Sequence, residues 1–403
     1  MTAAWAWALS LALAAAEASA EAFSVQGAMD RAAIRAPQVL LAESALREAE
    51  ASRTGAGVVL PANPRLYGEG RYGAGTGGYA ASLEAPFEVF GAPAARVTEA
   101  RGRAVAAQAD LDLERYLARW AVFEAYVEVR MGGLRLAEAQ SAIELAQGVE
   151  AASRRLVETG AASEIDRAVA SASLAEFRAE REAFLARQQA ALLPLRELLG
   201  LLPGAPLTLT TEFATPPSCA LAGPAGREAG GTHPALRAIQ ARLALGEATL
   251  ERLEREVLPR LSFLLGLDAA PNSDRYGQLG LGVELPVAQR NQGPRAVVAA
   301  QLSTDRMRLE LTSQRLLREL EARRAACEAR QREAEMLGAL AIPEARKALA
   351  LVEAGWRAGK FDVFRVNAAA RDVVRLGQAR IDVLGAAWRE HVAMQRLAGG
   401  GEP

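Results

Sequence analysis

Residues 260–268 read Arg-Leu-Ser-Phe-Leu-Leu-Gly-Leu-Asp, and residues 276–285 read Tyr-Gly-Gln-Leu-Gly-Leu-Gly-Val-Glu-Leu. Large apolar side chains alternate with small or polar ones in both stretches, which is the period of a β-strand. About ten residues of this alternation match a tilted strand that crosses an outer membrane. An ordinary half-buried antiparallel sheet in a soluble domain explains these two strands equally well.

The second half of the chain repeats landmarks of the first half in the same order. The offset between paired landmarks stays between 197 and 200 residues. The pairs are Ala36-Pro37 with His233-Pro234, Leu60-Pro61 with Leu258-Pro259, Glu84-Ala85-Pro86-Phe87 with Glu284-Leu285-Pro286-Val287, Gly160 with Gly359, and Leu198-Leu199-Gly200 with Leu397-Ala398-Gly399. We therefore expect a tandem duplication of a unit of about 200 residues.

Each repeat is expected to run helix, two strands, very long helix, tight turn and long helix. The first repeat covers residues 21–202, with strands at about 65–89 and long helices at about 94–157 and 163–199. The second covers residues 233–399, with strands at about 260–285 and long helices at about 295–354 and 362–397. Residues 203–232, rich in Pro, Gly and Ala, form the linker, and residues 400–403 form a tail.

Glycine and proline residues mark the expected turns and helix ends of each repeat. Residues 73–78 are glycine-rich and predict a hairpin between the first two strands. The first helix of each repeat is expected to begin at Pro37 or Pro234 and to end at Leu60-Pro61 or Leu258-Pro259, because proline cannot continue a helix.

The long helices are too long for one compact globule. No proline interrupts residues 94–157, and about 64 residues make a rod of about 95 Å. Its counterpart contains Pro343, where we expect a kink. Rods of this length must pack as antiparallel hairpins and against other copies of the chain. The apolar positions of the first rod step at three and four: Tyr116, Trp120, Phe123, Val127, Met131 and Leu134.

The composition excludes several classes of protein. Hydrophobic residues make up 51% and aromatic residues 5%, which is typical of long packed helices. With 47 basic and 48 acidic residues, the net charge of −1 gives no electrostatic case for nucleic acid. Cys219 and Cys327 lie 108 positions apart without a CxxC motif, so we expect two unpaired thiols. His233 and His391, the two histidines, are expected to pack or cap rather than to bind metal.

The N-terminus predicts a secretory signal. Residues 1–20 contain a short apolar core followed by Ala18-Ser19-Ala20, so we expect cleavage after Ala20. The segment before the core has no Lys or Arg, which leaves a buried N-terminal helix as the alternative. No later stretch of about 18 uninterrupted apolar residues occurs.

Together these features resemble the TolC-type outer-membrane efflux family over essentially the whole mature chain. The residues that carry the resemblance are Pro37 and Pro234, Leu60-Pro61 and Leu258-Pro259, Phe90-Gly91 and Gln292-Gly293-Pro294, the turns at Gly160 and Gly359, and Leu198-Leu199-Gly200. The resemblance implies a mainly α fold with a membrane β-barrel, in which three chains build twelve strands continuous with an α-helical periplasmic tunnel.

The resemblance also implies a function without an active site or a cofactor. The homotrimer would be the passive exit duct of a tripartite pump, held in the lipid of the cell outer membrane. A periplasmic adaptor at the helical tips and an inner-membrane pump of the RND or ABC type would deliver small molecules or ions. The sequence does not name the cargo.

Two groups of residues are candidates for the channel's selectivity and gating. Glu84, Glu284 and Gln278 are expected to face the lumen, where six carboxylates in a trimer favour cations; both glutamates could instead cap the sheet edge beside Pro86 and Pro286. The family often closes its tunnel with acidic side chains after the turn glycine. Here the residues in that region suggest an Asp-Arg gate: Asp166, Arg365 and Asp362. Alternatively, Asp166 completes a capping box with Ser163, and Ser163 and Asp362 are expected N-caps.

A periplasmic coiled-coil adaptor or a structural protein is the rival interpretation. An adaptor would carry one helical hairpin inside a split lipoyl-like and β-barrel region, without duplication of both strands and helices. An enzyme is the weakest class, since Ser, His and acidic residues form no triad pattern.

Overall fold

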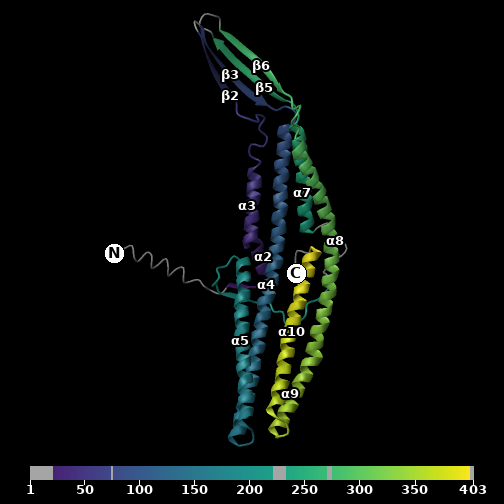
Figure 1. The fold of residues 1–403 in the computed structure, drawn as a ribbon. Coiled ribbons are helices and arrows are strands. Elements are labelled where there is room, and N and C mark those ends of the chain that lie inside the picture. Colours follow the sequence, from purple (N-terminus) through teal and green to yellow (C-terminus); the bar gives the residue numbers. More distant parts are fainter. Residues whose placement is uncertain (1–20, 74–75, 221–232, 270–274, 400–403) are drawn as a thin grey trace, which may run out of the picture. The chain divides into compact units, whose positions relative to one another are not determined.

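The computed structural model describes residues 21–73, 76–220, 233–269 and 275–399 (Figure 1). The expected signal, residues 221–232 of the linker, the tail and the tip of each strand hairpin lie outside the described residues. The described chain divides into two compact units, and each unit combines segments from both halves of the sequence. The first unit contains residues up to 40, 114–233 and 315 onward; the second contains residues 41–113 and 234–314.

The second unit contains a four-stranded antiparallel sheet. Its strands are β2 (Arg65–Gly73), β3 (Thr76–Phe87), β5 (Arg260–Ala269) and β6 (Tyr276–Glu284). They lie side by side in the order β2-β3-β5-β6 (Figure 1). Strands β2 and β3 fall within the expected range 65–89, and β5 and β6 fall within 260–285.

The short helices differ from the expected ones. Helix α2 (Val25–Arg35) precedes α3 (Pro37–Ala51), so the first helical segment begins twelve residues before Pro37. Ala36 between them has an extended backbone with ψ 138°, because a residue before proline is driven out of the helical region. The expected helix end at Leu60-Pro61 is wrong: α3 ends at Ala51, and the turns that follow include Gly55 with φ +80°. Helix α7 (Pro234–Arg255) begins at Pro234 and ends four residues before Pro259.

Long helices make up most of the rest. Helix α4 (Ala92–Glu158) runs for 67 residues without interruption, and α5 (Glu164–Leu198) follows it. The counterpart of α4 is divided into α8 (Gln292–Met336), a π-turn η1 (Leu337–Ala341) and α9 (Ile342–Arg357), and α10 (Val363–Ala398) completes the series. The interruption lies directly before Pro343, where the proline ring would clash with a carbonyl one turn earlier.

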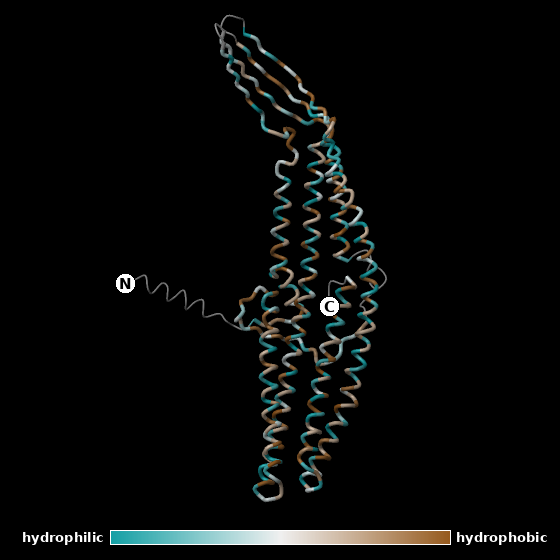
Figure 2. The backbone as a smooth tube through the Cα atoms, in the orientation of Figure 1, coloured by the Kyte–Doolittle hydropathy of each residue, from teal (hydrophilic) through white to brown (hydrophobic). Residues whose placement is uncertain are grey.

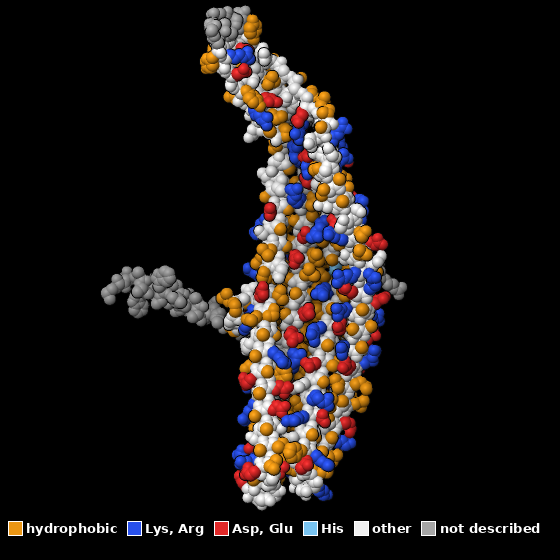
Figure 3. Space-filling view, viewed as in Figure 1, with side chains coloured by type: hydrophobic (Ala, Val, Ile, Leu, Met, Phe, Trp, Pro, Cys, Tyr) orange, Lys and Arg blue, Asp and Glu red, His pale blue; other side chains and the backbone are white. Residues whose placement is uncertain are grey.

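The apolar stripe that the sequence predicts on α4 forms the core of the first unit. Tyr116, Trp120, Phe123, Val127 and Met131 are all 0–7% exposed. Hydrophobic positions recur along the helices in the hydropathy view (Figure 2). On the face shown in Figure 3, Lys and Arg are mixed with Asp and Glu, and no large region carries one sign of charge.

Four helices pack together in the part of the first unit that contains both helical turns. The cluster joins Val149 of α4, Ala170 of α5, Trp356 of α9 and Val366 of α10, each 6% exposed or less. Leu349 and Val373 extend it. The two helical hairpins of one chain therefore bury their apolar faces against each other, as the expected antiparallel packing requires.

A short linker segment, residues 210–220, crosses the first unit. It follows β4 (Leu207–Leu209), which pairs in parallel with β1 (Glu21–Phe23). The amide of Thr211 donates to the Tyr126 hydroxyl at 2.8 Å, and the Trp388 indole donates to the carbonyl of Thr215 at 3.0 Å. The ring of Phe213 lies 4.7 Å from that of Trp388. We call this segment the strap.

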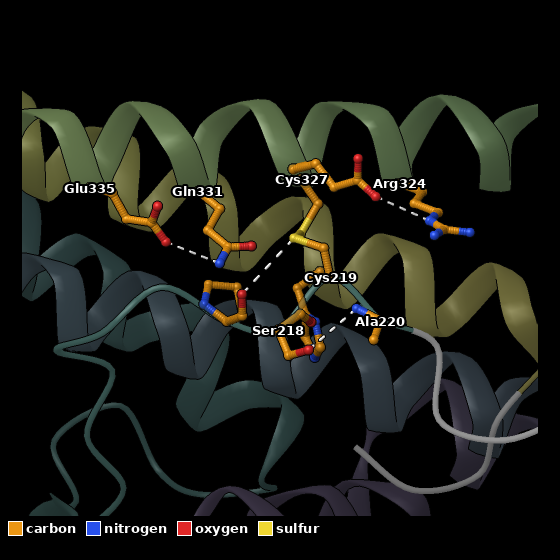
Figure 4. The surroundings of a disulfide bond; sticks show 10 residues. Ser218, Cys219, Ala220, Arg324, Cys327, Gln331 and Glu335 are labelled. Atoms are coloured by element: carbon orange, nitrogen blue, oxygen red, sulfur yellow. Dashed lines mark hydrogen bonds and ion pairs between the residues drawn. A yellow bond between two sulfur atoms is a disulfide. The ribbon is translucent and has the colours of Figure 1, made fainter.

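The strap ends at a disulfide bond. Cys219 is bonded to Cys327 of α8 (Figure 4), so the expectation of two unpaired thiols is wrong. The residues are 108 positions apart in sequence, but their Cα atoms lie 5.9 Å apart. Only the three-dimensional path of the strap brings the two thiols together.

Both histidines pack, as the sequence predicts. His233 is 4% exposed, and its Nε2 lies 3.1 Å from the carbonyl oxygen of Arg396. Nδ1 of His391 lies 2.8 Å from the carbonyl oxygen of Ser218 in the strap. Burial lowers the pKa of His391, and the contact with Ser218 opposes that shift.

A buried ion-pair cluster joins the sheet to α4 in the second unit. Glu88 is 5% exposed. Its carboxylate accepts a hydrogen bond from Arg96 at 2.6 Å and forms an ion pair with Arg260 at 3.3 Å. Arg96 also donates to the carbonyl of Val58 at 2.8 Å. One buried carboxylate thus connects the end of β3, the start of α4 and the start of β5.

Removal of this carboxylate should destabilise the protein. Glu88→Gln leaves two guanidinium groups without their shared partner and should lower the free energy of unfolding by about 3 kcal/mol. The matched control is Glu247→Gln, which breaks an exposed pair with Arg306 and should cost at most about 0.5 kcal/mol. Urea denaturation of both variants measures the difference, and equal losses would contradict the structural role of Glu88.

Candidate functional site

The sheet of the second unit has one uncovered apolar face. Its register aligns Leu66, Leu83, Leu265 and Leu279 in a row across all four strands. Leu66 and Leu279 are 77% and 76% exposed, and Leu281 is 76% exposed. Brown and teal positions alternate along these strands in Figure 2. A contiguous exposed apolar face of this kind marks a surface for lipid or for another protein.

The opposite face of the sheet contains mostly polar or small residues, with Leu264 beside Glu84 as an exception. One row across it contains Tyr67, Ser82, Gly266 and Gln278. A second row places Glu69 beside Ala80 and Asp268. The sheet can therefore contact an apolar medium on one face and water on the other.

Glu84 and Glu284 occupy matching places on the polar face. Glu84 lies opposite Arg65, and Glu284 lies opposite Arg260. The Tyr67 hydroxyl is 3.5 Å from the Glu84 carboxylate. Arg65 lies close enough to interact electrostatically with Glu84, which reduces the negative potential at that carboxylate. The guanidinium group of Arg260 is instead paired with Glu88. Neither arginine was predicted from the sequence to lie opposite a glutamate, although each is the first residue of a strand.

The two helical turns have the same backbone conformation. Gly160 has φ +72° and Gly359 has φ +71°, a region that favours glycine. The amide of Ala161 donates to the carbonyl oxygen of Leu156 at 2.7 Å. In the second turn, the amide of Lys360 donates to the carbonyl oxygen of Gly355 at 2.8 Å. These bonds satisfy carbonyls at the helix ends that would otherwise lack partners.

The candidate gate residues follow these turns and cap the next helices. Ser163 and Asp166 form the capping box that the sequence predicts: Ser163 N donates to the Asp166 carboxylate at 2.9 Å, and Asp166 N donates to Ser163 Oγ at 3.3 Å. Asp362 accepts from the Arg365 amide at 3.0 Å. The Arg365 guanidinium lies 5.1 Å from the centre of the Phe361 ring.

The charged gate residues remain exposed or half-exposed beside apolar ones. Ile165 is 66% exposed and Phe364 is 53% exposed. Within the described part of one chain, Asp166 and Arg365 form no ion pair with each other. A pair between them would therefore require two copies of the chain.

Two further findings concern residues 21–73, 76–220, 233–269 and 275–399, which the structure describes. In these ranges no three or more His, Cys, Asp or Glu side chains gather as metal ligands would. None of the helices described combines the length and apolarity needed to span a membrane.

Comparisons with known proteins place the fold. No protein-family model and no curated protein matches the sequence. The outer-membrane channel OprN covers 94% of this chain and 90% of its own at 20% identity, with a TM-score of 0.78. A membrane protein from Pseudomonas aeruginosa covers the same shares at 22% identity and 0.79. The outer membrane protein VceC from Vibrio cholerae covers 94% and 96% at 16% identity and 0.73.

These solved structures extend over nearly the whole chain, so the likeness includes the sheet and the long helices. The expected mainly α chain with a small antiparallel sheet and the likeness to TolC-type channels are thereby confirmed, and the twelve-stranded barrel of three chains stays a prediction. The chain has the fold of the TolC-type outer-membrane channels.

Proposed function

We propose that the protein is an outer-membrane efflux channel, the passive exit duct of a tripartite pump for small molecules or ions. The observation that carries the proposal is the sheet with one uncovered apolar face and one polar face, on a fold that solved outer-membrane channels share. The neighbours are channel proteins, which supports a role without covalent chemistry.

The proposal requires more than one copy of the chain. Strands β2 and β6 are the two edges of the sheet, and each has one neighbour within it. Unpaired strand edges cannot lie in hydrocarbon, since their N–H and C=O groups would lack partners. Three copies that pair edge to edge would form a closed twelve-stranded barrel, with the leucine rows outside and Gln278, Glu84 and Glu284 inside.

The partners follow from the same proposal. The helical turns at Gly160 and Gly359 would lie in the periplasm and receive an adaptor protein, with an inner-membrane pump of the RND or ABC type behind it. Exposed apolar side chains at these turns, such as Ile165 and Phe364, support a contact surface there. We also propose that the chain arose by tandem duplication and that its signal is cleaved after Ala20.

The face assignment can be tested by one pair of arginine substitutions. Leu281→Arg should place a charge against lipid and destabilise the folded channel by about 2–4 kcal/mol. Gln278→Arg, on the polar face of the same strand, should leave the amount of folded protein unchanged and alter conductance. Folded yield in outer-membrane fractions and conductance in planar bilayers measure the two effects. Equal loss of folded protein from both variants would contradict the proposal that the leucine face of the sheet contacts lipid.

We further propose that Asp166 of one chain pairs with Arg365 of the next across the tunnel mouth. The exposed guanidinium and the half-exposed carboxylate support this assignment, and the capping bonds of Asp166 leave one of its carboxylate oxygens available. Asp362 could add a second acceptor beside Arg365. At exposed positions each pair should contribute no more than about 1 kcal/mol.

Single-channel conductance can test this gate. Asp166→Ala and Arg365→Ala should each raise the open fraction partially, and the effect should shrink with added salt because screening weakens exposed pairs. The charge-swapped double variant should recover the closed state. Ser163→Ala is the control, because it weakens the cap and keeps both charges. If it matches Asp166→Ala, the capping role alone explains Asp166.

A further inference from the structure

The strap connects three helices of the first unit. The Tyr126 hydroxyl of α4 contacts its first part, and the Trp388 indole of α10 donates to one of its carbonyl oxygens at 3.0 Å. Near its end, Nδ1 of His391 lies 2.8 Å from the carbonyl oxygen of Ser218. The disulfide to Cys327 of α8 follows at the next residue of the strap (Figure 4). Unlike the hydrogen bonds, this last contact needs a chemical reaction before it can form.

Both cysteines of the disulfide are buried in the finished fold. Cys219 is 6% exposed and Cys327 is 0% exposed. A disulfide forms by exchange when a thiolate attacks a sulfur atom of an existing disulfide, so the reacting sulfur atoms have to touch. An oxidant of protein size carries its disulfide on a folded surface and cannot touch a buried sulfur. It can therefore act on this chain only while the strap lies away from α8.

The end of the strap is a surface segment that can lie away from α8 while the helices stay formed. Residues 214–220 contain no helix or strand. Four of them are exposed: Ala214, Thr215, Ser218 and Ala220. Phe213, which is 4% exposed and packs against Trp388, anchors the other end of this segment. An open strap therefore requires the loss of few contacts.

The two cysteines differ in backbone and in position along the chain. Pro216 and Pro217 stand shortly before Cys219 and favour an extended backbone. An extended segment can lie in a groove of another protein and present its side chains there. Cys327 lies inside α8, where the helix fixes the direction of its side chain, and it follows Cys219 by 108 residues. A chain exported from its N-terminus therefore presents Cys219 first and in the more adaptable backbone.

We propose that the chain is a substrate of a dithiol oxidase, a protein with a reactive surface disulfide, and that this partner reacts first with Cys219 of the open strap. The Cys219 thiolate attacks the oxidase disulfide and forms a mixed disulfide, and one oxidase sulfur leaves as a thiolate. The Cys327 thiolate then attacks Sγ of Cys219 and releases the oxidase. The chain loses two electrons and two protons, and the oxidase gains both as a dithiol. The proposal rests on export, which belongs to the proposed function, and needs no channel activity.

The order of oxidation and packing can be tested on the purified full chain. Dithiothreitol supplies two electrons and two protons, converts the disulfide to two thiols and is itself oxidised to a cyclic disulfide. It should reduce the native protein in detergent at least about 100-fold more slowly than the protein unfolded in urea, because the packed strap has to open first. Alkylation of the free thiols and mass spectrometry measure both rates. Equal rates would overturn the proposal, since the sulfur atoms would then be accessible in the finished fold.

The partner can be tested in bacterial cells that secrete the mature chain, residues 21–403. A host signal directs export, so a failure of the predicted signal or of the channel function does not affect the result. In cells that lack their dithiol oxidase, the share of exported chain with the Cys219–Cys327 bond should fall at least about tenfold. An unchanged share would overturn the proposal, because the bond would then form without this partner.

Two single variants identify the sulfur that reacts first. Each keeps one cysteine and cannot complete the exchange, so its mixed disulfide with a tagged oxidase persists after acid quenching. Cys327→Ser, which keeps Cys219, should give at least about fivefold more mixed disulfide in cells than Cys219→Ser. As the matched control, both variants unfolded in urea should react equally with 5,5′-dithiobis(2-nitrobenzoate). Equal yields of mixed disulfide in cells would contradict the reaction through Cys219.

Discussion

The uncovered leucine face of the sheet is the constraint on which the rest of the molecule depends. Apolar surface in water costs about 25 cal/mol per Å², and the row that runs from Leu66 to Leu279 is exposed at both ends. The polar face cannot be buried against an apolar core in compensation, because it contains Glu84, Asp268 and Gln278. The proposed channel would satisfy this constraint, with lipid on one side of the sheet, water on the other and a strand of another copy at each open edge.

The same left-handed backbone conformation occurs at three pairs of helix ends. The left-handed residues Gly91, Gly160 and Gly200 recur about 200 positions later as Asn291, Gly359 and Gly399. Asn291 has φ +54° and is the single non-glycine with positive φ among the described residues. Asparagine tolerates this conformation better than other side chains. These pairs support the proposed duplication through the backbone conformation as well as through the sequence landmarks.

The periodicity of the sequence predicted strands and buried helix faces, because these depend on local pattern. It did not predict contacts that depend on strand register or on the three-dimensional path of the linker. Alternation gave β5 and β6, and the stripe from Tyr116 to Met131 gave the core of α4. The guanidinium opposite each glutamate was missed, because it depends on which residues face each other across the hairpin. The disulfide was missed because Cys219 lies in a linker without periodicity and Cys327 in a polar helix.

Charged residues in this protein serve mainly to hold structure. Glu88 joins three elements, Asp166 and Asp362 cap helices, and the glutamates of the polar face lie opposite arginines. In the proposed channel, the interaction of Glu84 with Arg65 would weaken discrimination between cations and anions, because opposite charges close together partly cancel each other's field. Under the proposed function, cargo would be selected where it enters, and this chain would provide the diameter, orientation and closure of the channel. Such a role agrees with the structural use of Glu88, Asp166 and Asp362, which join or cap elements of the fold.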